Sequence, residues 1–392
     1  MMNWRVPFGD LKIGPSAKRR ITEALDSNWI SEGRFVREFE KKFAEKFGWK
    51  HAITTSSGTD AGMVVWSAIK EIEGVSPLKY LTVVTPACAF ASTANCLMAA
   101  RCAPVFCDIE LTTLNLSAAF RDQSSFSIHH GIAIQFVATM GKPTPIREIA
   151  SIAKKHDLYL VADFCEAHGA DYLMPKICFP KESPVIADHY ADAAIYSFYV
   201  AHLIQGGEGG IICTDDDELA SLCRSIKSHG RPAGATYFSF DRIGYNSKWN
   251  EMCAAVALEG LEKFDEAFAK RREVRRMLVD ALSQFEDDLI IYRDGPGEVI
   301  SPHAFPIVLR DETRDVKPLC DYLERSGVQV KTLFGSLPTQ HKAFELLGHE
   351  LGDFPVAERV GRTGLHFGCN EFMTEEDVGF ITYKIGEWLT NI

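Results

Sequence analysis

The sequence predicts an α/β protein built on a largely parallel β-sheet and followed by a smaller α+β domain. Over the first part of the chain, short apolar runs typical of strands alternate with amphipathic helical segments, the pattern of a parallel sheet covered on both faces. Turns containing serine and glycine follow several of these runs. Near residue 250 the alternation gives way to a long charged helical stretch. We therefore expect a large domain over 1–250 and a small C-terminal domain over 251–392.

The first 250 residues supply the elements of the large domain. Phe39, Phe43 and Phe47 recur at four-residue spacing and indicate the buried face of a helix over 36–47. Further helices are expected over 21–25, 60–72 and 146–156. The predicted strands are the apolar segments at 52–55, 80–85, 104–108, 132–137, 158–162 and 193–196.

The rest of the chain supplies the small domain. Residues 250–282 predict a long helix interrupted only at Gly260. Strands are expected over 289–292 and 303–309, with a helix over 316–326 after them. Thr374 precedes three acidic residues, which is typical of an N-cap and first helical turn, so a C-terminal helix is expected to begin there.

The composition is ordinary for a globular protein and argues against two classes of partner. Of the 392 residues, 46% are hydrophobic and 24% are charged, and the net charge is −11. Nucleic-acid binders usually carry a basic excess, so we expect no nucleic-acid partner. No apolar run reaches the ~18 residues of a membrane span, and the first residues lack the apolar core of a secretory signal. We therefore expect a cytoplasmic protein without membrane contact.

Three polar segments follow predicted strands, where α/β sheets commonly bind ligands. The Ser-Gly-Thr sequence at 57–59 lies between a strand and a helix, where glycine permits close approach of the backbone and free helix amides favour a phosphate. Asp163 lies at the end of an apolar strand. The segment from Ser197 to His202 follows a short strand and leads into the glycines of 206–210, which permit a tight passage beside a ligand.

Each segment also has an ordinary structural explanation. Ser-Gly-Thr is a common helix start, and Asp163 suits the cap of a short helix over 165–169. A single histidine such as His202 is more often a satisfied core residue than a functional one. Taken one at a time, the three segments leave the function open.

Taken together and in order, these segments resemble the DegT/DnrJ/EryC1/StrS family of sugar aminotransferases and dehydratases. The resemblance covers nearly the whole chain. It implies an aspartate-aminotransferase-like (type I) fold dependent on pyridoxal 5′-phosphate (PLP), with a mixed, mostly parallel seven-stranded sheet in the large domain. The matching segments are WISEG at 29–33, FE at 39–40, SGT at 57–59, TPACAF at 85–90, PVF at 104–106, DFCEAHG at 163–169, SFYVAH at 197–202 with GGEGG at 206–210, and GYN at 244–246.

The resemblance also implies roles for single residues toward the cofactor. Phe90 would stack on the cofactor ring, and Asp163 would keep its pyridine nitrogen protonated. Glu166 stands where the aminotransferases have a cofactor-contacting glutamine. Asn246 would reach the phosphate bound by a second subunit, which implies a homodimer with shared active sites. The phosphate contacts within one chain would come from Ser57, Gly58, Thr59 and Ser197.

The largest departure from the aminotransferases is His202, which replaces their cofactor-binding lysine. Imidazole forms no stable covalent link to PLP, but with an ordinary pKa of about 6.5 it can move a proton near neutral pH. A subgroup of the family, the nucleotide-sugar 3-dehydratases such as GDP-4-keto-6-deoxymannose 3-dehydratase, shares this histidine and the tyrosine at the position of Tyr199. The resemblance thus implies removal of the C3 hydroxyl of a 4-keto-6-deoxy nucleotide sugar, with His202, Asp163 and Tyr199 as catalytic residues.

The cysteines bear on which dehydratase type is the better guide. One type holds a [2Fe–2S] cluster on cysteines that follow the histidine segment, and residues 227–250 contain no cysteine here. We therefore expect no metal and no iron–sulfur cluster. The resemblance then implies the cluster-free type, which renews pyridoxamine 5′-phosphate (PMP) with glutamate as amino donor. The chain's eleven cysteines look like reduced core residues, as at Cys96, Cys213 and Cys253.

Two other functions stay open at this point. The chain resembles the aminotransferases more than the dehydratases over 163–169, so amine transfer to a nucleotide sugar is the first alternative. A non-catalytic binder of sugar nucleotides is the second, although such a protein would have little need for the carboxylate of Asp163.

Overall fold

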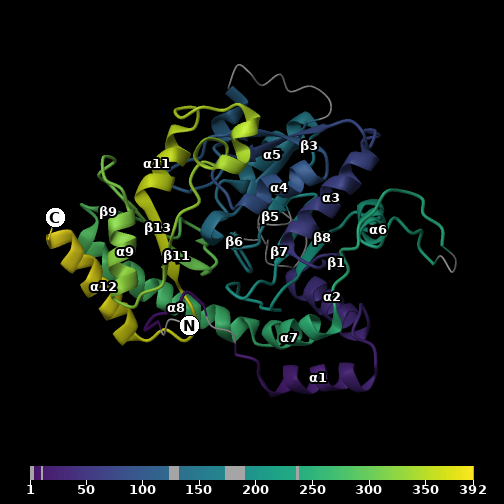
Figure 1. Cartoon of the computed structure of the whole chain (residues 1–392), viewed down its shortest axis with the longest axis horizontal. Coiled ribbons are helices and arrows are strands. Elements are labelled where there is room, and N and C mark those ends of the chain that lie inside the picture. The colour runs from purple at the N-terminus through teal and green to yellow at the C-terminus, as the bar shows by residue number, and fades with distance from the viewer. Residues whose placement is uncertain (1–3, 10–11, 123–131, 173–189, 235–237, 392) are drawn as a thin grey trace.

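A seven-stranded sheet forms the centre of the large domain (Figure 1). The computed structural model describes residues 4–9, 12–122, 132–172, 190–234 and 238–391. Within the sheet, β8 runs antiparallel to both of its neighbours, and the other neighbouring strands pair in parallel. The predicted mixed, mostly parallel sheet is therefore confirmed. Its strand order is β1 (His51–Thr55), β8 (Gly210–Thr214), β7 (Ala193–Ser197), β5 (Leu160–Asp163), β4 (Ile132–Val137), β2 (Leu81–Pro86) and β3 (Cys102–Cys107).

Both faces of this sheet are buried, which explains the continuous apolar character of its strands. In β7, Ala193 and Ile195 join one hydrophobic cluster, whereas Ala194 and Tyr196 join the cluster on the opposite face. One face is covered by α3 (Gly58–Ile72), α4 (Ala91–Ala99) and α6 (Asp217–Ile226). The cluster on the other face includes residues of α2 (Arg34–Phe47), α5 (Ile146–His156) and α7 (Glu251–Glu262).

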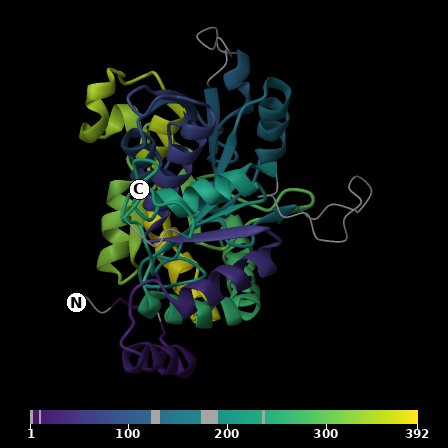
Figure 2. The same ribbon diagram turned by 90° about the vertical axis from the view of Figure 1, so that its right-hand side faces the viewer.

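The phenylalanine spacing in α2 predicted its buried face correctly. Phe39, Phe43 and Phe47 are all buried and their rings contact one another in sequence. A further helix, α1 (Pro15–Asp26), begins earlier than the predicted 21–25 because a proline occupies its first turn. This helix lies at the outer edge of the molecule and packs against α7 (Figures 1 and 2).

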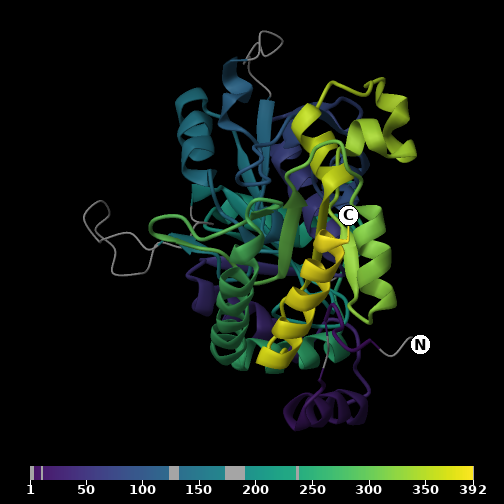
Figure 3. The same ribbon diagram turned by 90° about the vertical axis from the view of Figure 1, so that its left-hand side faces the viewer.

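The second part of the chain is built on a four-stranded antiparallel sheet of order β12 (Val330–Thr332), β13 (Gly364–Gly368), β11 (Ala304–Leu309) and β9 (Leu289–Ile291). Figure 3 shows α8 (Phe264–Leu282) and α12 (Glu375–Thr390) side by side against it. Thr374 and Asp377 form a capping box at the start of α12, as the sequence predicted. The other helices of this part are α9 (Lys317–Arg325), α10 (Leu337–Gln340) and α11 (Pro355–Thr363). Short 3₁₀ turns lie in the first part of the chain, at η1 (Ala118–Asp122) and η2 (Thr139–Gly141), and in the second part, at η4 (Ser283–Phe285) and η5 (Lys342–Leu347).

The helical stretch over 250–282 breaks at a different residue from the one predicted. Gly260 lies inside α7, and the chain changes direction at Lys263, between α7 and α8. A Cβ at Gly260 would lie at ordinary van der Waals distance from the backbone of Gln205 and Ile204, so this glycine neither breaks the helix nor is required by its packing. Residues of α7 belong to the core of the large sheet and the later part of α8 to the core of the small sheet. A domain boundary at residue 250 stays a prediction.

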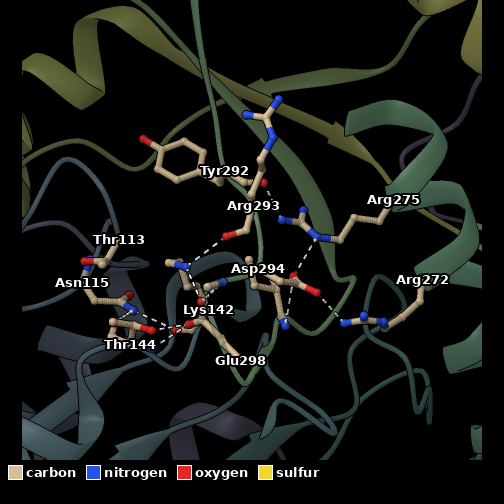
Figure 4. A network of polar contacts seen from close by, with 12 residues as sticks. Thr113, Asn115, Lys142, Thr144, Arg272, Arg275, Tyr292, Arg293, Asp294 and Glu298 are labelled. Carbon is tan, nitrogen blue, oxygen red and sulfur yellow. Dashed lines mark hydrogen bonds and ion pairs between the residues drawn. The ribbon is translucent and has the colours of Figure 1, made fainter. Parts of the chain in front are cut away.

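A polar network joins the segment after β4 of the large domain to the segment between β9 and β11 of the small domain (Figure 4). Lys142, beyond β4, donates to the carboxylate of Glu298 at 2.5 Å and to the carbonyl of Arg293 at 3.2 Å. Glu298 begins β10 (Glu298–Val299), which pairs with β6 (Asp171–Tyr172) of the large domain. Asn115 donates to the carbonyl oxygen of Lys142 at 2.7 Å, so the lysine is fixed through its backbone as well.

No helix in the described ranges is both long and apolar enough to cross a bilayer. All ten cysteines that the structure describes are free thiols, and Cys96 and Cys213 are buried as predicted, whereas Cys253 is half-buried. Cys178 lies outside the described residues.

Candidate active site

A cavity of about 530 Å³ opens between the carboxyl ends of the large-sheet strands and the strands of the small sheet. From the large domain it is lined by nine of the predicted site residues and from the small domain by three side chains that sequence reasoning did not find, His303, Lys331 and His366. The nine are Ser57, Gly58, Thr59, Phe90, Asp163, Glu166, Ser197, Tyr199 and His202. The parallel strands end on the same side of the sheet, which is why segments far apart in sequence meet here.

The start of α3 forms the first wall of the cavity. Ser57 is the N-cap, and its hydroxyl accepts a hydrogen bond from the amide of Asp60 at 3.0 Å. The amides of Gly58 and Thr59 stand at the first positions of the helix, where no intrahelical acceptor exists. A Cβ on Gly58 would come within 2.9 Å of the Cβ of Ser197, so glycine allows the helix start to lie against β7. The arrangement fits a phosphate.

Asp163, at the end of β5, is buried and faces the cavity. Its carboxylate accepts from the hydroxyl of Thr93 at 3.3 Å and from the amide of Cys165 at 3.1 Å. Burial raises the pKa of this carboxyl, and the two hydrogen-bond donors oppose the effect. No cation among the described residues pairs with it. A buried carboxylate of this kind fits a cationic ring nitrogen of a bound ligand.

Phe90 and Tyr199 supply the aromatic surface of the site. Phe90 caps α4, is 61% exposed and makes an edge contact with Phe334 of the small domain at a centroid distance of 5.9 Å. The face of its ring is thus available to a planar ligand. Tyr199 is 44% exposed and lies edge-on to His202 at 6.2 Å.

His202 is buried in the turn after β7, and its amide donates to the carbonyl of Tyr199 at 3.0 Å. Its Nδ1 lies 3.4 Å from Nδ1 of His303. Burial, followed by the positive charges of Arg271 and Lys331, lowers the pKa of His202 to about 3. The sequence suggested a base with an ordinary pKa, and this expectation is wrong. The imidazole is neutral at physiological pH, mainly because it is desolvated.

Glu166 has the opposite electrostatics. Its Oε2 accepts from the amide of Met140 at 2.8 Å, and its Oε1 lies 3.6 Å from Nε2 of His303. Burial raises the pKa of Glu166 to about 7. The carboxyl can therefore change its charge near neutral pH, which the glutamine of the aminotransferases cannot do.

Asn246 is exposed and is not among the residues that line this cavity. Its side-chain oxygen accepts from the ammonium of Lys248 at 2.6 Å. A contact from Asn246 to a cofactor would therefore have to be made across a subunit boundary. Among the described residues, no group of three or more His, Cys, Asp or Glu side chains is placed to hold a metal ion.

The residues that sequence reasoning missed come mostly from the small domain. His366 lies on β13 beside Lys331 on β12, and His303 immediately precedes β11. Neither β12 nor β13 was predicted, so no sequence signal joined these side chains to His202. Thr93 could have been predicted as a site residue from the sequence, because it lies in the helix that follows the TPACAF segment.

Comparison with known proteins gives one consistent result. Residues 12–385 match the DegT/DnrJ/EryC1/StrS aminotransferase family. A dTDP-4-dehydro-2,6-dideoxy-D-glucose 3-dehydratase of Saccharopolyspora spinosa is 28% identical, over 94% of this chain and 83% of the relative. A GDP-perosamine synthase of Escherichia coli O157:H7 is 25% identical, over 98% of this chain and 99% of the relative.

Solved structures agree on the fold. The E. coli GDP-4-keto-6-deoxy-D-mannose-3-dehydratase with bound hydrated PLP has a TM-score of 0.83 at 24% identity, covering 98% of this chain and 99% of that one. The Helicobacter pylori PseC, an aminotransferase involved in the biosynthesis of pseudoaminic acid, has a TM-score of 0.83 at 21% identity, covering 99% of this chain and 100% of that one. The predicted PLP-dependent aminotransferase fold is confirmed. The relatives include both dehydratases and aminotransferases.

Proposed function

The chain belongs to the DegT/DnrJ/EryC1/StrS family of PLP-dependent sugar-modifying enzymes, and from this premise we propose that it removes the C3 hydroxyl of a 4-keto-6-deoxy nucleotide sugar. The observation that carries the proposal is that His202 lines the cavity, at the position where the resemblance implies the lysine of the aminotransferases. A side chain without a primary amine cannot anchor the cofactor covalently, but its imidazole can exchange protons.

The cavity fits the family's cofactor. The free amides at the start of α3, beside Ser197, suit its phosphate, and the exposed face of Phe90 suits its ring. Asp163 suits the ring nitrogen, because a cation there would relieve the burial of its carboxylate. When bound as PMP, the cofactor would supply an amine for the 4-keto group and a ring that can accept electrons.

The protein's own residues then have defined tasks. Asp163 keeps the ring nitrogen protonated, and Phe90 fixes the plane of the ring. His202 takes up a proton at the nitrogen that faces the cavity. Tyr199, which is 44% exposed and lines the same cavity as His202, would orient the substrate at the leaving hydroxyl. The imidazole of His202 would form no stable covalent bond with the carbon that carries the amine of the cofactor. That carbon would therefore stay free for the sugar.

The test uses the purified protein with PLP and glutamate, followed by a 4-keto-6-deoxy sugar nucleotide labelled with ¹⁸O at C3. Loss of the label as water, measured by mass spectrometry, is the expected result. The variant His202→Asn should retain the label, whereas the surface variant His341→Gln should behave as the wild type. If the wild-type protein retained the label with every one of the common nucleotides, the proposal would be contradicted.

Amine transfer to a nucleotide sugar is the second candidate function, and one observation favours it. Lys331 lines the cavity from β12, so a primary amine is present although position 202 lacks one. Lys248, in contrast, is not among the lining residues. Borohydride reduction of the PLP-loaded protein followed by peptide mapping distinguishes the two functions. A cofactor adduct on Lys331 would favour amine transfer.

A non-catalytic sugar-nucleotide binder is the remaining alternative. It predicts no cofactor absorbance band after incubation with PLP, whereas the enzyme proposals predict one.

We also propose that the protein works in the cytoplasm as a homodimer with shared active sites. Large apolar side chains are exposed near Asn246: Phe238 is 85% and Ile243 is 74% exposed. A second copy that covers this segment would bring Asn246 to the partner's phosphate site. Size-exclusion chromatography with light scattering tests the dimer, and a monomeric wild-type protein would contradict it.

A further inference from the structure

Two buried histidines and one half-buried glutamate follow one another in space beside the cavity. Nδ1 of His202 is 3.4 Å from Nδ1 of His303. On the other side of the same ring, Nε2 of His303 is 3.6 Å from Oε1 of Glu166. The second distance is slightly longer than a hydrogen bond, and contacts of this kind commonly shorten when an active site binds its ligands. The residues come from three separate segments: the turn after β7, the residue before β11 and the turn after β5.

The central histidine links the other two because both of its ring nitrogens are engaged. A neutral imidazole has one N–H donor and one acceptor nitrogen. When Glu166 is a carboxylate it can only accept, so Nε2 of His303 must donate and its Nδ1 must accept. The Nδ1 of His202 then carries the proton and donates to His303. This leaves Nε2 of His202 with a free lone pair, and that nitrogen makes no hydrogen bond to any residue in the described ranges.

Protonation of Glu166 reverses every donor in the line. The carboxylic acid then donates to Nε2 of His303, whose Nδ1 donates to Nδ1 of His202. In this state the proton of His202 sits on Nε2, the nitrogen left for a ligand in the cavity. The same imidazole thus changes from a proton acceptor to a proton donor without becoming charged.

We propose that Glu166, acting through His303, determines which ring nitrogen of His202 carries the proton, and that the three groups pass a proton between the cavity and Glu166. The part that names His202 as the base rests on the proposed function. His303 and Glu166 are positioning residues in this scheme.

The transfer balances without any other reactant. As a proton leaves the substrate and binds Nε2 of His202, the proton on Nδ1 of His202 moves to Nδ1 of His303. The proton on Nε2 of His303 then moves to Oε1 of Glu166. Three bonds to hydrogen break and three form, no electrons are exchanged with a redox partner, and the net result is one proton moved from the substrate to Glu166.

The surroundings support this assignment of the charge to Glu166. Burial lowers the pKa of His202 to about 3 and holds the pKa of His303 well below its ordinary range. Glu166 is the member of the line that titrates near neutral pH, because burial raises its pKa to about 7. Of the three side chains, only Glu166 therefore holds the transferred proton stably near neutral pH.

Several neighbours contribute to these values, and each acts in the expected direction. Glu166 faces Asp163, which raises its pKa, and Lys331, which lowers it. For the two histidines, the nearby basic and imidazole groups disfavour protonation: Arg271 of α8 and Lys331 of β12 at His202, and His202, His366, Arg271 and His168 at His303. An ionised Glu166, whose Oε1 lies 3.6 Å from Nε2 of His303, acts in the opposite direction at His303.

The experiment reads the tautomer of His202 directly. The full-length protein is labelled with ¹⁵N-histidine and reconstituted with PMP, and the signals of His202 are assigned by their absence in His202→Asn. Two-bond ¹H–¹⁵N correlation spectra then distinguish Nδ1–H from Nε2–H. The wild type should change from the Nε2–H form to the Nδ1–H form as pH rises from about 6 to about 8, with a midpoint near the pKa of Glu166.

Variants show whether the line causes the change. In Glu166→Gln the tautomer should stay constant over this range, because the amide does not titrate. His303→Phe should also abolish the transition, and His366→Gln, a cavity histidine outside the line, should keep it. If His303→Phe does not fold, Glu166→Gln decides alone. A wild-type tautomer that ignores pH, or a Glu166→Gln protein with the wild-type transition, would overturn the proposal.

The outcome does not depend on sugar chemistry. A tautomer transition in a protein that keeps the C3 oxygen would support the line of proton carriers and contradict the proposed function. Loss of the oxygen by a protein whose His202 tautomer is constant would contradict the line alone.

Discussion

The ion pair between Lys142 and Glu298 allows a prediction about how the two sheets stay together (Figure 4). The side chains of Lys142 and Glu298 are 10% and 1% exposed, and the carboxylate also accepts from the amide of Gly295 at 2.8 Å and the amide of Thr144 at 3.2 Å. The change Glu298→Gln leaves the ammonium of Lys142 buried without its countercharge. Removing one partner of such a pair typically costs about 3–5 kcal/mol of unfolding free energy.

The double variant Lys142→Met/Glu298→Gln separates the charge effect from general disruption. With no charge left uncompensated, the double variant should be more stable than the sum of the single changes by at least ~2 kcal/mol. Equilibrium urea unfolding, followed by tryptophan fluorescence, measures the four proteins. The exposed pair Arg34–Glu23 is a matched control, and its coupling energy should not exceed about 1 kcal/mol.

The pH dependence of this pair has a definite sign. Burial acts to raise the pKa of Glu298, but hydrogen bonds from Lys142 and Thr144 bring it below its ordinary value of 4.5. The folded protein therefore releases this proton more readily than the unfolded chain, so the stability is present above pH 4.5 and is lost as pH falls through the lower, folded pKa.

In the comparison of single and double variants, effects of the two single changes that add within ~0.5 kcal/mol would refute the reasoning, because they would show that the two charges do not interact.

Three further predictions concern the cavity. Burial lowers the pKa of His366 to about 3 from an ordinary 6.5, so the unfolded chain binds one more proton than the folded protein between these pH values. The free energy of unfolding therefore falls as pH decreases from 6 to 4. In His366→Gln, urea unfolding should show this fall reduced by up to about 1.4 kcal/mol per pH unit. Gly58→Ala should weaken PLP binding at least about tenfold in an absorbance titration, since its Cβ would lie 2.9 Å from the Cβ of Ser197, whereas Gly379→Ala, with open space around it, should not. Asp163→Asn should lower kcat about a hundredfold or more while retaining the fold by circular dichroism, and an unchanged kcat would contradict the role given to its carboxylate.

The large sheet could be predicted because each of its strands is buried on both faces and the helices between them have one apolar side. The antiparallel strand β8 was missed although it lies inside the sheet, next to the edge strand β1. Its five residues begin at Gly210, the last glycine of the segment 206–210, so the strand looks like a continuation of a loop. Only pairing with β1 and β7 makes Gly210–Thr214 a strand, and pairing of distant segments has no local signal.

The same limit applied to the site. The residues at the ends of large-sheet strands were predictable, because parallel strands end on one side and their motifs are short and local. His303 follows His202 by 101 residues and enters the cavity only because the small sheet packs over the large one. The low pKa of His202 was equally hidden, since it results from burial by both domains.

Two departures from the aminotransferase pattern, His202 and Glu166, were visible in the sequence as separate features, and the structure connects them. A histidine that burial holds neutral keeps an accepted proton poorly, since its pKa is about 3, so a neighbour that takes up the proton favours the transfer. Glutamine at position 166 could orient such a histidine but could not hold the proton. Glutamate can, because its pKa is raised to about 7, and His303 supplies the contact between the two. A protein that had merely lost its lysine would have no reason to carry a titrating carboxyl at the other end of this line, so the pair of substitutions favours proton transfer over a degraded site.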